Sequence, residues 1–216
     1  MTPDALAALR DAAVEAVHLA GAVMLRHLGR VAVETSKSCH QDLVTAVDKQ
    51  CQDVIKAHLL ARFPAAAFLG EEDVEPGSDA SAAAIRRLQH EEVLFICDPI
   101  DGTTNFVADL ALSVVSIGVA HRGEVVAGVI HHPYRAETFA AARGAGAWLN
   151  GTRRLAVSHE TALPSALVAY GLSHTPSIAL RMIAGLTAVV GSCRGARSLG
   201  SAALHLAYVA AGRLEL

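Results

Sequence analysis

The sequence predicts a layered α/β or α+β fold for this chain of 216 residues. Apolar residues recur at helical spacing in the first part of the chain, and short apolar runs typical of strands follow them. Further helical patterns alternate with short strands towards the end. Helices that precede strands, followed by alternating elements, are typical of a sheet covered by helices.

Two helices are expected at the start of the chain. Apolar residues from Leu6 to Leu28 repeat at helical spacing, Thr2-Pro3-Asp4 is a favourable helix start, and Gly29 a favourable stop. A second helical pattern runs from about Ala46 to Phe63, and Pro64 stops it.

Short apolar runs then predict strands. The runs Ala66–Gly70 and Val93–Cys97 each end at acidic residues. Val114–Ala120 and Val125–His132 flank a loop from His121 to Glu124, which is a hairpin pattern. The remaining expectations are a loop at Glu75–Ser81, helical turns at Ala82–Leu88, a hairpin of Thr138–Ala142 with Gly146–Leu149, a strand at Ala166–Ala169, and helices at Pro176–Val189 and Ser201–Ala211.

Composition excludes several classes of protein. Hydrophobic residues make up 52% and charged residues 18%, which excludes a disordered chain. The net charge is −3, with 18 Lys and Arg against 21 Asp and Glu, so the sequence offers no basic field to hold a nucleic-acid backbone and argues against nucleic acid as a partner. No run reaches the ~18 uncharged apolar residues that a membrane span needs.

The cysteines indicate a reducing environment. The four cysteines, at positions 39, 51, 97 and 193, form no C-x-x-C pair, and the first residues read as a helix with internal charges rather than as a secretory leader. We therefore expect a cytoplasmic protein.

Carboxylates concentrate where two apolar runs end. Glu71 follows the first run, and Asp98 and Asp101 follow the second, with Pro99 stiffening the backbone between them. Strand ends are where layered α/β proteins place their sites. The two aspartates, with the Ile100 carbonyl, offer the oxygen ligands that Mg²⁺ prefers.

The residues after Asp101 suit an anion. Gly102 lets the backbone approach a ligand closely, while Thr103 and Thr104 add hydroxyl groups. Each pattern alone is common in solvated loops and turns. Carboxylates at two successive strand ends, beside an anion cradle, favour a metal-dependent phosphate-ester site.

Four segments carry a resemblance to a known family. The segment from Asp98 to Phe106, DPIDGTTNF, resembles the signature of the inositol monophosphatases. Asp42–Asp48 (DLVTAVD) resembles the family's upstream D-x-V-T-x-x-D segment, Gly70–Glu72 its GEE segment, and Gly200–Ala203 its later G-[ST]-A-A segment. The central motif is long and specific, and the resemblance covers essentially the whole chain.

The resemblance implies a fold and an assembly. The fold would be an alternating αβαβα layered sandwich, with its C-terminal part incomplete, in a single domain over residues 1–216. An α+β part with the metal site would cover about residues 1–150, and the start of an α/β part about residues 151–216. The family further implies a homodimer that is sensitive to lithium.

The resemblance also implies roles for individual residues. Two or three Mg²⁺ ions would bind Glu71, Asp98, the Ile100 carbonyl and Asp101. Asp48 and Thr103, assisted by Glu71, would orient and activate a nucleophilic water. The substrate would contact Asp101, Gly102, Thr103, Gly200, Ser201 and Ala202.

Two departures from the family pattern bear on activity. The family continues for a further α/β segment that carries a substrate-binding Glu and a W-D-x-A-[AG]-G motif whose Asp is a metal ligand. Both would fall beyond Leu216, and Glu215 aligns with neither, so the chain as given is expected to lack one ligand of the second metal. His205 stands where relatives commonly carry Asp or Asn, and we interpret it as a helix-face residue rather than a substrate contact.

Two further features of the sequence allow both a functional and a structural interpretation. The pair His131-His132 is interpreted as a strand end rather than a metal site, because no third ligand follows at metal spacing. Lys37 is compatible both with a loop beside the metals and with a solvated loop.

The leading functional hypothesis is Mg²⁺-dependent hydrolysis of inositol monophosphate or a related sugar or cyclitol phosphate by a metal-activated water. Nucleotide 3′-phosphatase, fructose-bisphosphatase and histidinol-phosphatase activities of the same superfamily remain open. An alternative of another class is a metal-binding pseudoenzyme or fragment that acts by associating with another protein.

Overall fold

The computed structural model describes residues 1–30, 35–36, 43–74, 78–173 and 175–215. Its main feature is a seven-stranded sheet in the order β3-β4-β5-β6-β7-β8-β9. β3 and β4 pair in parallel, whereas the other neighbours in this sheet pair antiparallel. The strands are β3 (Ala67–Gly70), β4 (Leu94–Asp101), β5 (Val114–His121), β6 (Glu124–His132), β7 (Glu137–Ala142), β8 (Gly146–Leu149) and β9 (Arg153–Arg154).

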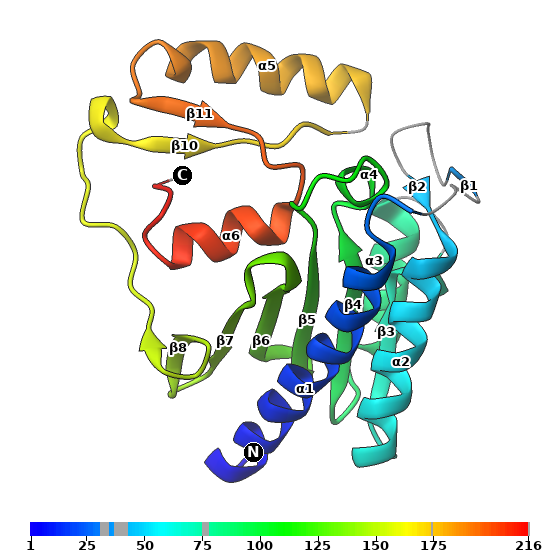
Figure 1. Cartoon of the computed structure of the whole chain (residues 1–216). Coiled ribbons are helices and arrows are strands. Elements are labelled where there is room, and N and C mark those ends of the chain that lie inside the picture. The colour runs from blue at the N-terminus through cyan, green and yellow to red at the C-terminus, as the bar shows by residue number, and fades with distance from the viewer. Residues whose placement is uncertain (31–34, 37–42, 75–77, 174, 216) are drawn as a thin grey trace.

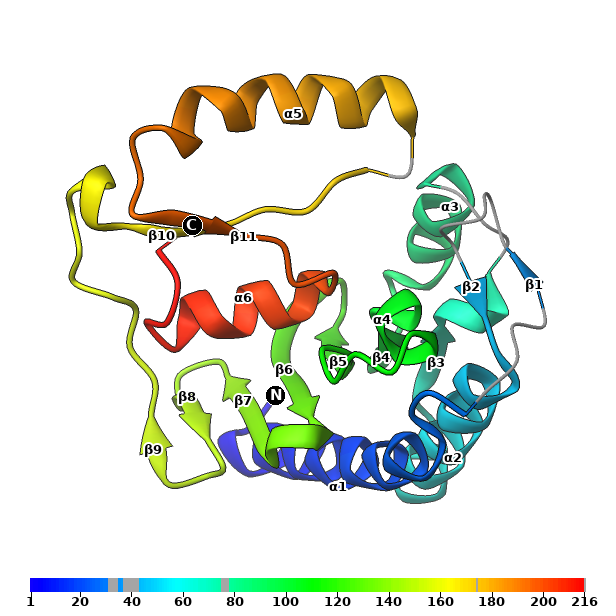
Figure 2. The same ribbon diagram turned by 45° about the horizontal axis from the view of Figure 1, so that its top comes forward.

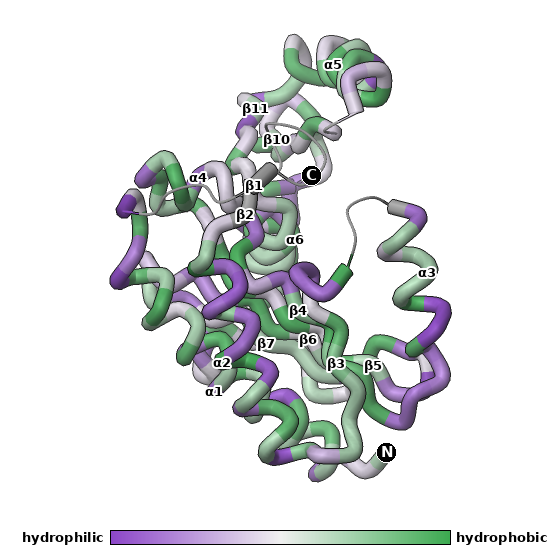
Figure 3. The backbone as a smooth tube through the Cα atoms, turned by 90° about the vertical axis from the view of Figure 1, so that its right-hand side faces the viewer, coloured by the Kyte–Doolittle hydropathy of each residue, from purple (hydrophilic) through white to green (hydrophobic). Residues whose placement is uncertain are grey.

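Helices cover both faces of this sheet. α1 (Pro3–His27) and α2 (Ala46–Arg62) pack side by side on one face. α3 (Ser78–Leu88) and α6 (Ala202–Ala210) lie on the opposite face, α3 over β3 and α6 over β5 and β6. Figure 3 shows α3 across the sheet from α1 and α2.

A second, smaller sheet lies beyond α6. It consists of the parallel strands β10 (Leu167–Ala169) and β11 (Gly195–Arg197), and α5 (Pro176–Val190) lies outside it. Figures 1 and 2 show the resulting order: α1 and α2, the large sheet, α6, the small sheet, α5. The predicted αβαβα arrangement is therefore confirmed.

The helix boundaries follow from the capping residues that the sequence predicts. The Thr2 side chain accepts a hydrogen bond from the backbone N–H of Ala5 (3.3 Å), and Gly29, at φ +64°, follows the last turn of α1. α2 begins with a reciprocal capping box between Thr45 and Asp48.

The hairpin between β5 and β6 has a tighter turn than expected. His121 pairs with Glu124, so the loop consists of Arg122 and Gly123 alone. Both have positive φ, +51° and +83°, which is the conformation of a turn whose twist matches its flanking strands.

β4 extends further than its apolar run. The strand continues through Asp98 to Asp101, with a register shift between these two residues. Pro99 lies in that irregular stretch, where the missing N–H of a proline costs no ladder hydrogen bond.

The remaining differences concern short elements. α3 begins at Ser78, inside the predicted loop. The short strands β1 (Thr35–Ser36), β2 (Leu43–Val44), β9 and β11 were not predicted, because pairs and triplets of residues carry no readable periodicity. α4 (Thr103–Val107) is likewise too short to predict. No helix in the described part of the chain is long and apolar enough to cross a membrane.

Small residues let α1 approach the sheet closely. The buried side of α1 includes Ala12, Ala13, Ala16, Ala20 and Gly21. At Gly21, an added Cβ would lie 2.6 Å from Cδ2 of His131 on β6, well inside van der Waals contact. The helix and the sheet are therefore packed at a separation that only glycine permits at this position.

Two glycines within helices should respond oppositely to replacement by alanine. Gly21→Ala should lower the free energy of unfolding, because the new methyl group displaces the buried His131 ring. Gly185→Ala, on the exposed surface of α5 where an added Cβ meets nothing within 4 Å, should raise it by about 0.5–1 kcal/mol. Urea denaturation measures both. Stabilisation by Gly21→Ala would contradict the close packing of α1.

Candidate active site

The parallel pairing of β3 with β4 brings two carboxylates together. Gly70 is in register with Cys97, so Glu71 and Asp98 both follow directly at the same edge of the sheet. Their carboxyl groups lie within hydrogen-bonding reach of each other. Burial, followed by the negative charges of Glu71 and Asp101, raises the pKa of Asp98 well above its ordinary value. The concentration of acidic groups that the sequence predicts is therefore present.

Asp101 links this edge to α6. Its Oδ2 accepts hydrogen bonds from Oγ of Ser201 (2.7 Å) and from the backbone N–H of Ala203 (2.6 Å). Ser201 is the buried N-cap of α6 and accepts the N–H of Leu204 (3.2 Å). Asp101 thus stabilises the first turn of a helix that begins a hundred residues later.

Asp48 and Thr103 form the second part of the site. Oδ2 of the buried Asp48 accepts the Thr45 backbone N–H (2.9 Å) and hydroxyl (2.6 Å). The Thr103 hydroxyl lies 3.2 Å from Asp48 Oδ1 and 3.0 Å from the Ile100 carbonyl oxygen, and its proton can go to one acceptor at a time. Burial raises the pKa of Asp48, while the hydrogen bonds from Thr45 and Thr103 oppose that shift.

Gly102 in the DPIDGTTNF segment and Gly200 in the G-[ST]-A-A segment allow their two loops to pack against each other. Gly102 has φ +99°, and an added Cβ would lie 3.1 Å from the carbonyl oxygen of Gly200. At Gly200, with φ +70°, an added Cβ would lie 2.7 Å from Nδ2 of Asn105. That amide donates to the carbonyl oxygens of Leu199 (2.7 Å) and Leu112 (3.2 Å). The start of α4 therefore touches the loop before α6.

Gln52 is a positioning residue that sequence reasoning missed. It is buried on α2, and its Oε1 accepts the backbone N–H of Glu72 (3.0 Å). A Cβ on Gly70 would collide with the same amide group, so Gly70 is needed for this contact. The sequence feature that could have identified Gln52 is its spacing, because it lies four residues after Asp48 and therefore on the same face of the helix.

His205 has a specific partner within the chain. Its Nε2 accepts the backbone N–H of Leu199 (2.9 Å), so the ring holds the loop that leads to Gly200 and Ser201. Burial lowers the pKa of His205, which favours the neutral ring that can accept this bond. His205 lies on α6 as expected, and its ring positions the loop that precedes this helix.

The remaining residues that the sequence singled out are His131, His132, Ala202, Lys37 and Asp42. β6 ends at His132, which confirms the strand-end interpretation of His131-His132. Ala202 lies exposed at the start of α6. Lys37 and Asp42 lie outside the described residues.

The donor set fits magnesium. Glu71, Asp98 and the Ile100 carbonyl offer only oxygen atoms, and the closely spaced carboxylates repel each other without a cation. Among the described residues, no three His, Cys, Asp or Glu side chains converge closely enough to hold a metal by themselves. Mg²⁺ rarely needs such a cage, since water and substrate phosphate commonly complete its shell.

Comparison with known proteins agrees with this geometry. The model of the inositol monophosphatase family matches residues 5–216. The inositol-1-monophosphatase of Rhizobium meliloti is 36% identical over 98% of this chain and 76% of that protein. The crystal structure of extragenic suppressor protein suhB from Bartonella henselae has a TM-score of 0.83 at 36% identity, covering 96% of this chain and 76% of that one.

A second solved structure extends the agreement. The Thermotoga maritima IMPase has a TM-score of 0.80 at 31% identity, covering 94% of this chain and 73% of that one. The family match includes every segment that forms the site, from Asp48 on α2 to Ser201 at α6. The chain therefore belongs to the inositol monophosphatase family.

Proposed function

We propose that this chain hydrolyses inositol monophosphate, or a related sugar or cyclitol phosphate, with Mg²⁺ as cofactor. The observation that carries the proposal is the meeting of the Glu71–Asp98 carboxylate pair with the Asp48–Thr103 hydrogen bond at one edge of the sheet. Membership of a family of phosphoric monoester hydrolases supports the reaction type. Glu71, Asp98, Asp101 and the Ile100 carbonyl would hold the metal.

Thr103 and Asp48 would orient the attacking water. When the Thr103 hydroxyl donates to Asp48, its oxygen can accept a hydrogen bond from the water and direct the water's lone pair towards phosphorus. As the water attacks, its proton would pass to Thr103 while the Thr103 proton passes to Asp48. Asp48 then serves as the base that acts through Thr103, with Glu71 assisting. Bound Mg²⁺ would lower the pKa of that water and neutralise the leaving oxygen.

The substrate would lie between α4 and α6. The backbone N–H groups of Gly102 and Thr103 would bind phosphate, since the positive φ of Gly102 turns the chain sharply into α4. Gly200, Ser201 and Ala202 would contact the sugar or cyclitol, because the Asp101–Ser201 bond holds their loop against this site.

The number of metal ions, the inhibition by lithium, the assembly and the location form part of the same proposal. We propose two or three Mg²⁺ ions per site, lithium inhibition by occupation of a metal position, and a homodimer. A cytoplasmic location agrees with the free thiols of the three described cysteines, Cys51, Cys97 and Cys193.

The decisive experiment measures phosphate release from myo-inositol 1-phosphate by the 216-residue chain, with Mg²⁺ and after EDTA treatment. Release should require Mg²⁺. Fructose 1,6-bisphosphate, histidinol phosphate and adenosine 3′,5′-bisphosphate complete the panel. If a folded chain released phosphate from none of these substrates, the proposed activity would be rejected. If it hydrolysed adenosine 3′,5′-bisphosphate alone, the substrate would be a nucleotide rather than a sugar or cyclitol phosphate.

Asp98→Asn should abolish Mg²⁺-dependent turnover while the fold persists. Without Mg²⁺, the variant should unfold at a higher temperature than the parent chain, because it removes one of the repelling carboxylates. Mg²⁺ should stabilise the parent chain but not the variant. Thermal unfolding with and without Mg²⁺ measures both effects.

Asp73→Asn is the matched control. Asp73 lies in the same acidic segment but is exposed and paired with Lys56 (3.1 Å). This variant should keep both its activity and its stabilisation by Mg²⁺. If Asp98→Asn behaved like the control, the metal assignment would be wrong.

Thr103→Ala should lower kcat by about 10²-fold or more, with a smaller effect on KM, since the hydroxyl acts on the attacking water. Thr103→Ser retains the hydroxyl and should recover most of the rate. Steady-state kinetics at saturating Mg²⁺ measure both variants. A change in KM alone would assign Thr103 to substrate binding instead.

A further inference from the structure

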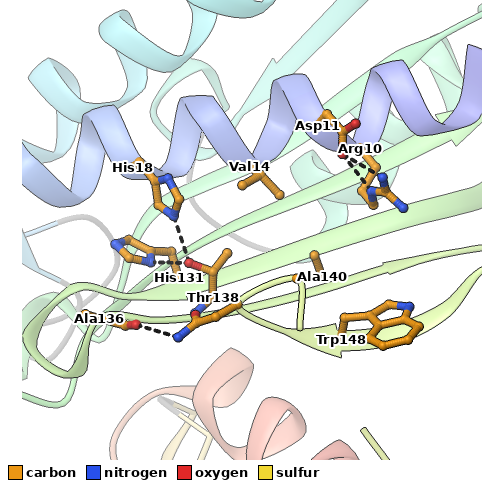
Figure 4. Close-up of a pocket in the computed structure, with 11 residues that line it drawn as sticks. Arg10, Asp11, Val14, His18, His131, Ala136, Thr138, Ala140 and Trp148 are labelled. Carbon is orange, nitrogen blue, oxygen red and sulfur yellow. Dashed lines mark hydrogen bonds and ion pairs between the residues drawn. The ribbon is translucent and has the colours of Figure 1, made fainter. Parts of the chain in front are cut away.

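A cavity of about 720 Å³ lies between the N-terminal half of α1 and the strands β6–β8. Figure 4 shows it with α1 along one side and the β7–β8 hairpin along the other. None of its lining residues belongs to the candidate active site. Its volume is in the range of sites that take drug-sized molecules, ~300–1,000 Å³.

The lining follows from two sequence periodicities. On α1, Arg10, Val14 and His18 are spaced four residues apart and form one stripe beside the buried alanines. On the sheet, alternate residues face this stripe, because β7 and β8 direct every second side chain to the same side. These are Thr138 and Ala140 on β7, and Trp148 with Asn150 at the end of β8.

One end of the cavity is polar. The Thr138 hydroxyl lies 2.8 Å from Nε2 of His18 and 3.0 Å from Nδ1 of His131. A single hydroxyl donates to one ring and accepts from the other, so the two imidazoles are held in complementary tautomers. Burial lowers the pKa of His131 to about 4, which keeps that ring neutral at physiological pH. Asn150 is fixed beside them, because its Oδ1 accepts the Thr138 backbone N–H (2.7 Å).

The other end offers a rigid aromatic surface. Nε1 of Trp148 donates to the Ala145 carbonyl oxygen (2.9 Å), which fixes the indole ring. The guanidinium of Arg10 binds Asp11 through Nε (2.9 Å) and Nη2 (2.7 Å), so these opposite charges offset each other. The charge of Arg10 is therefore already paired, unlike that of an arginine in a phosphate site.

The middle of the cavity is apolar. Val14 and Ala140 lie between the histidine end and the Trp148 end, as Figure 4 shows. A free sugar or cyclitol placed there would leave hydroxyl groups without hydrogen-bond partners, which is costly. In a nucleoside, by contrast, the base would occupy the apolar middle and the ribose hydroxyl groups would reach the polar end at His18 and Asn150. A flat ring with polar atoms at its edge would instead contact the apolar middle and stack against Trp148.

We propose that this cavity is a second, non-catalytic ligand site, which takes an uncharged heteroaromatic molecule of nucleoside size. The ring system would stack on Trp148, and a donor or acceptor group at the opposite end would bind His18 and Asn150. The proposal is independent of the phosphatase activity, because the two sites share no residue.

The cavity contains its own reporter. Trp148 is the one tryptophan in the sequence, so fluorescence excited at about 295 nm reports on this residue alone. Adenosine, an uncharged nucleoside, is the probe. Its addition should change Trp148 fluorescence saturably, whereas myo-inositol and inorganic phosphate should have no effect.

Two variants of α1 separate binding in the cavity from binding elsewhere. Val14→Phe fills the middle of the cavity and should weaken adenosine binding at least tenfold. Leu25→Phe makes a similar change on the exposed surface of the same helix, where Leu25 is 55% exposed, and should leave binding unchanged. Circular dichroism checks that both variants fold, and His18→Leu tests the polar end should Val14→Phe fail to fold.

The outcomes are distinct from those of the activity tests. Mg²⁺-dependent phosphate release by Val14→Phe should equal that of the parent chain. An absent or non-saturable response to adenosine, or equal affinities in Val14→Phe and Leu25→Phe, would overturn the proposal. A saturable response to myo-inositol or phosphate in place of adenosine would overturn the assigned ligand class.

Discussion

The parallel register of β3 with β4 is the constraint on which the candidate active site depends. It places Glu71 and Asp98 at the same height, although 27 positions separate them in the chain. The remaining pairs of the large sheet are antiparallel and serve mainly to build the core. A shift of one residue in this single parallel pair would turn one carboxylate to the other face.

Asp101 shows how one carboxylate contributes to both architecture and chemistry. Its bonds to Ser201 and Ala203 bind α6 to the end of β4, and the close approach of Gly102 to Gly200 reinforces that junction. The same side chain adds negative charge near Asp98. Because neighbouring negative charges raise the pKa of Asp98, we expect a bound Mg²⁺ to relieve the repulsion among these acidic groups.

The candidate active site and the cavity beneath α1 differ in the chemistry they offer. The candidate active site gathers carboxylates and backbone N–H groups at strand ends, which suits a cation and a phosphate. The cavity beneath α1 combines two hydrogen-bonded imidazoles with a fixed indole, and its Arg10–Asp11 ion pair is internally balanced. Electrostatics alone would therefore direct charged and uncharged ligands to different parts of the molecule.

The sequence by itself determined the elements with strong local signals and the identity of the chemical groups. Capping residues located α1 and α2, apolar runs located β3–β6, and the DPIDGTTNF segment identified the carboxylates, because these signals lie within a few adjacent residues. The tertiary structure alone decided the short strands, the contact of Gln52 with Glu72, and the attachment of His205 to Leu199. It also decided the cavity beneath α1. Some of these features depend on contacts between residues far apart in the chain. The others are strands of two or three residues, which are too short to show a hydrophobic periodicity. Their physical cause is therefore tertiary packing rather than a local sequence pattern.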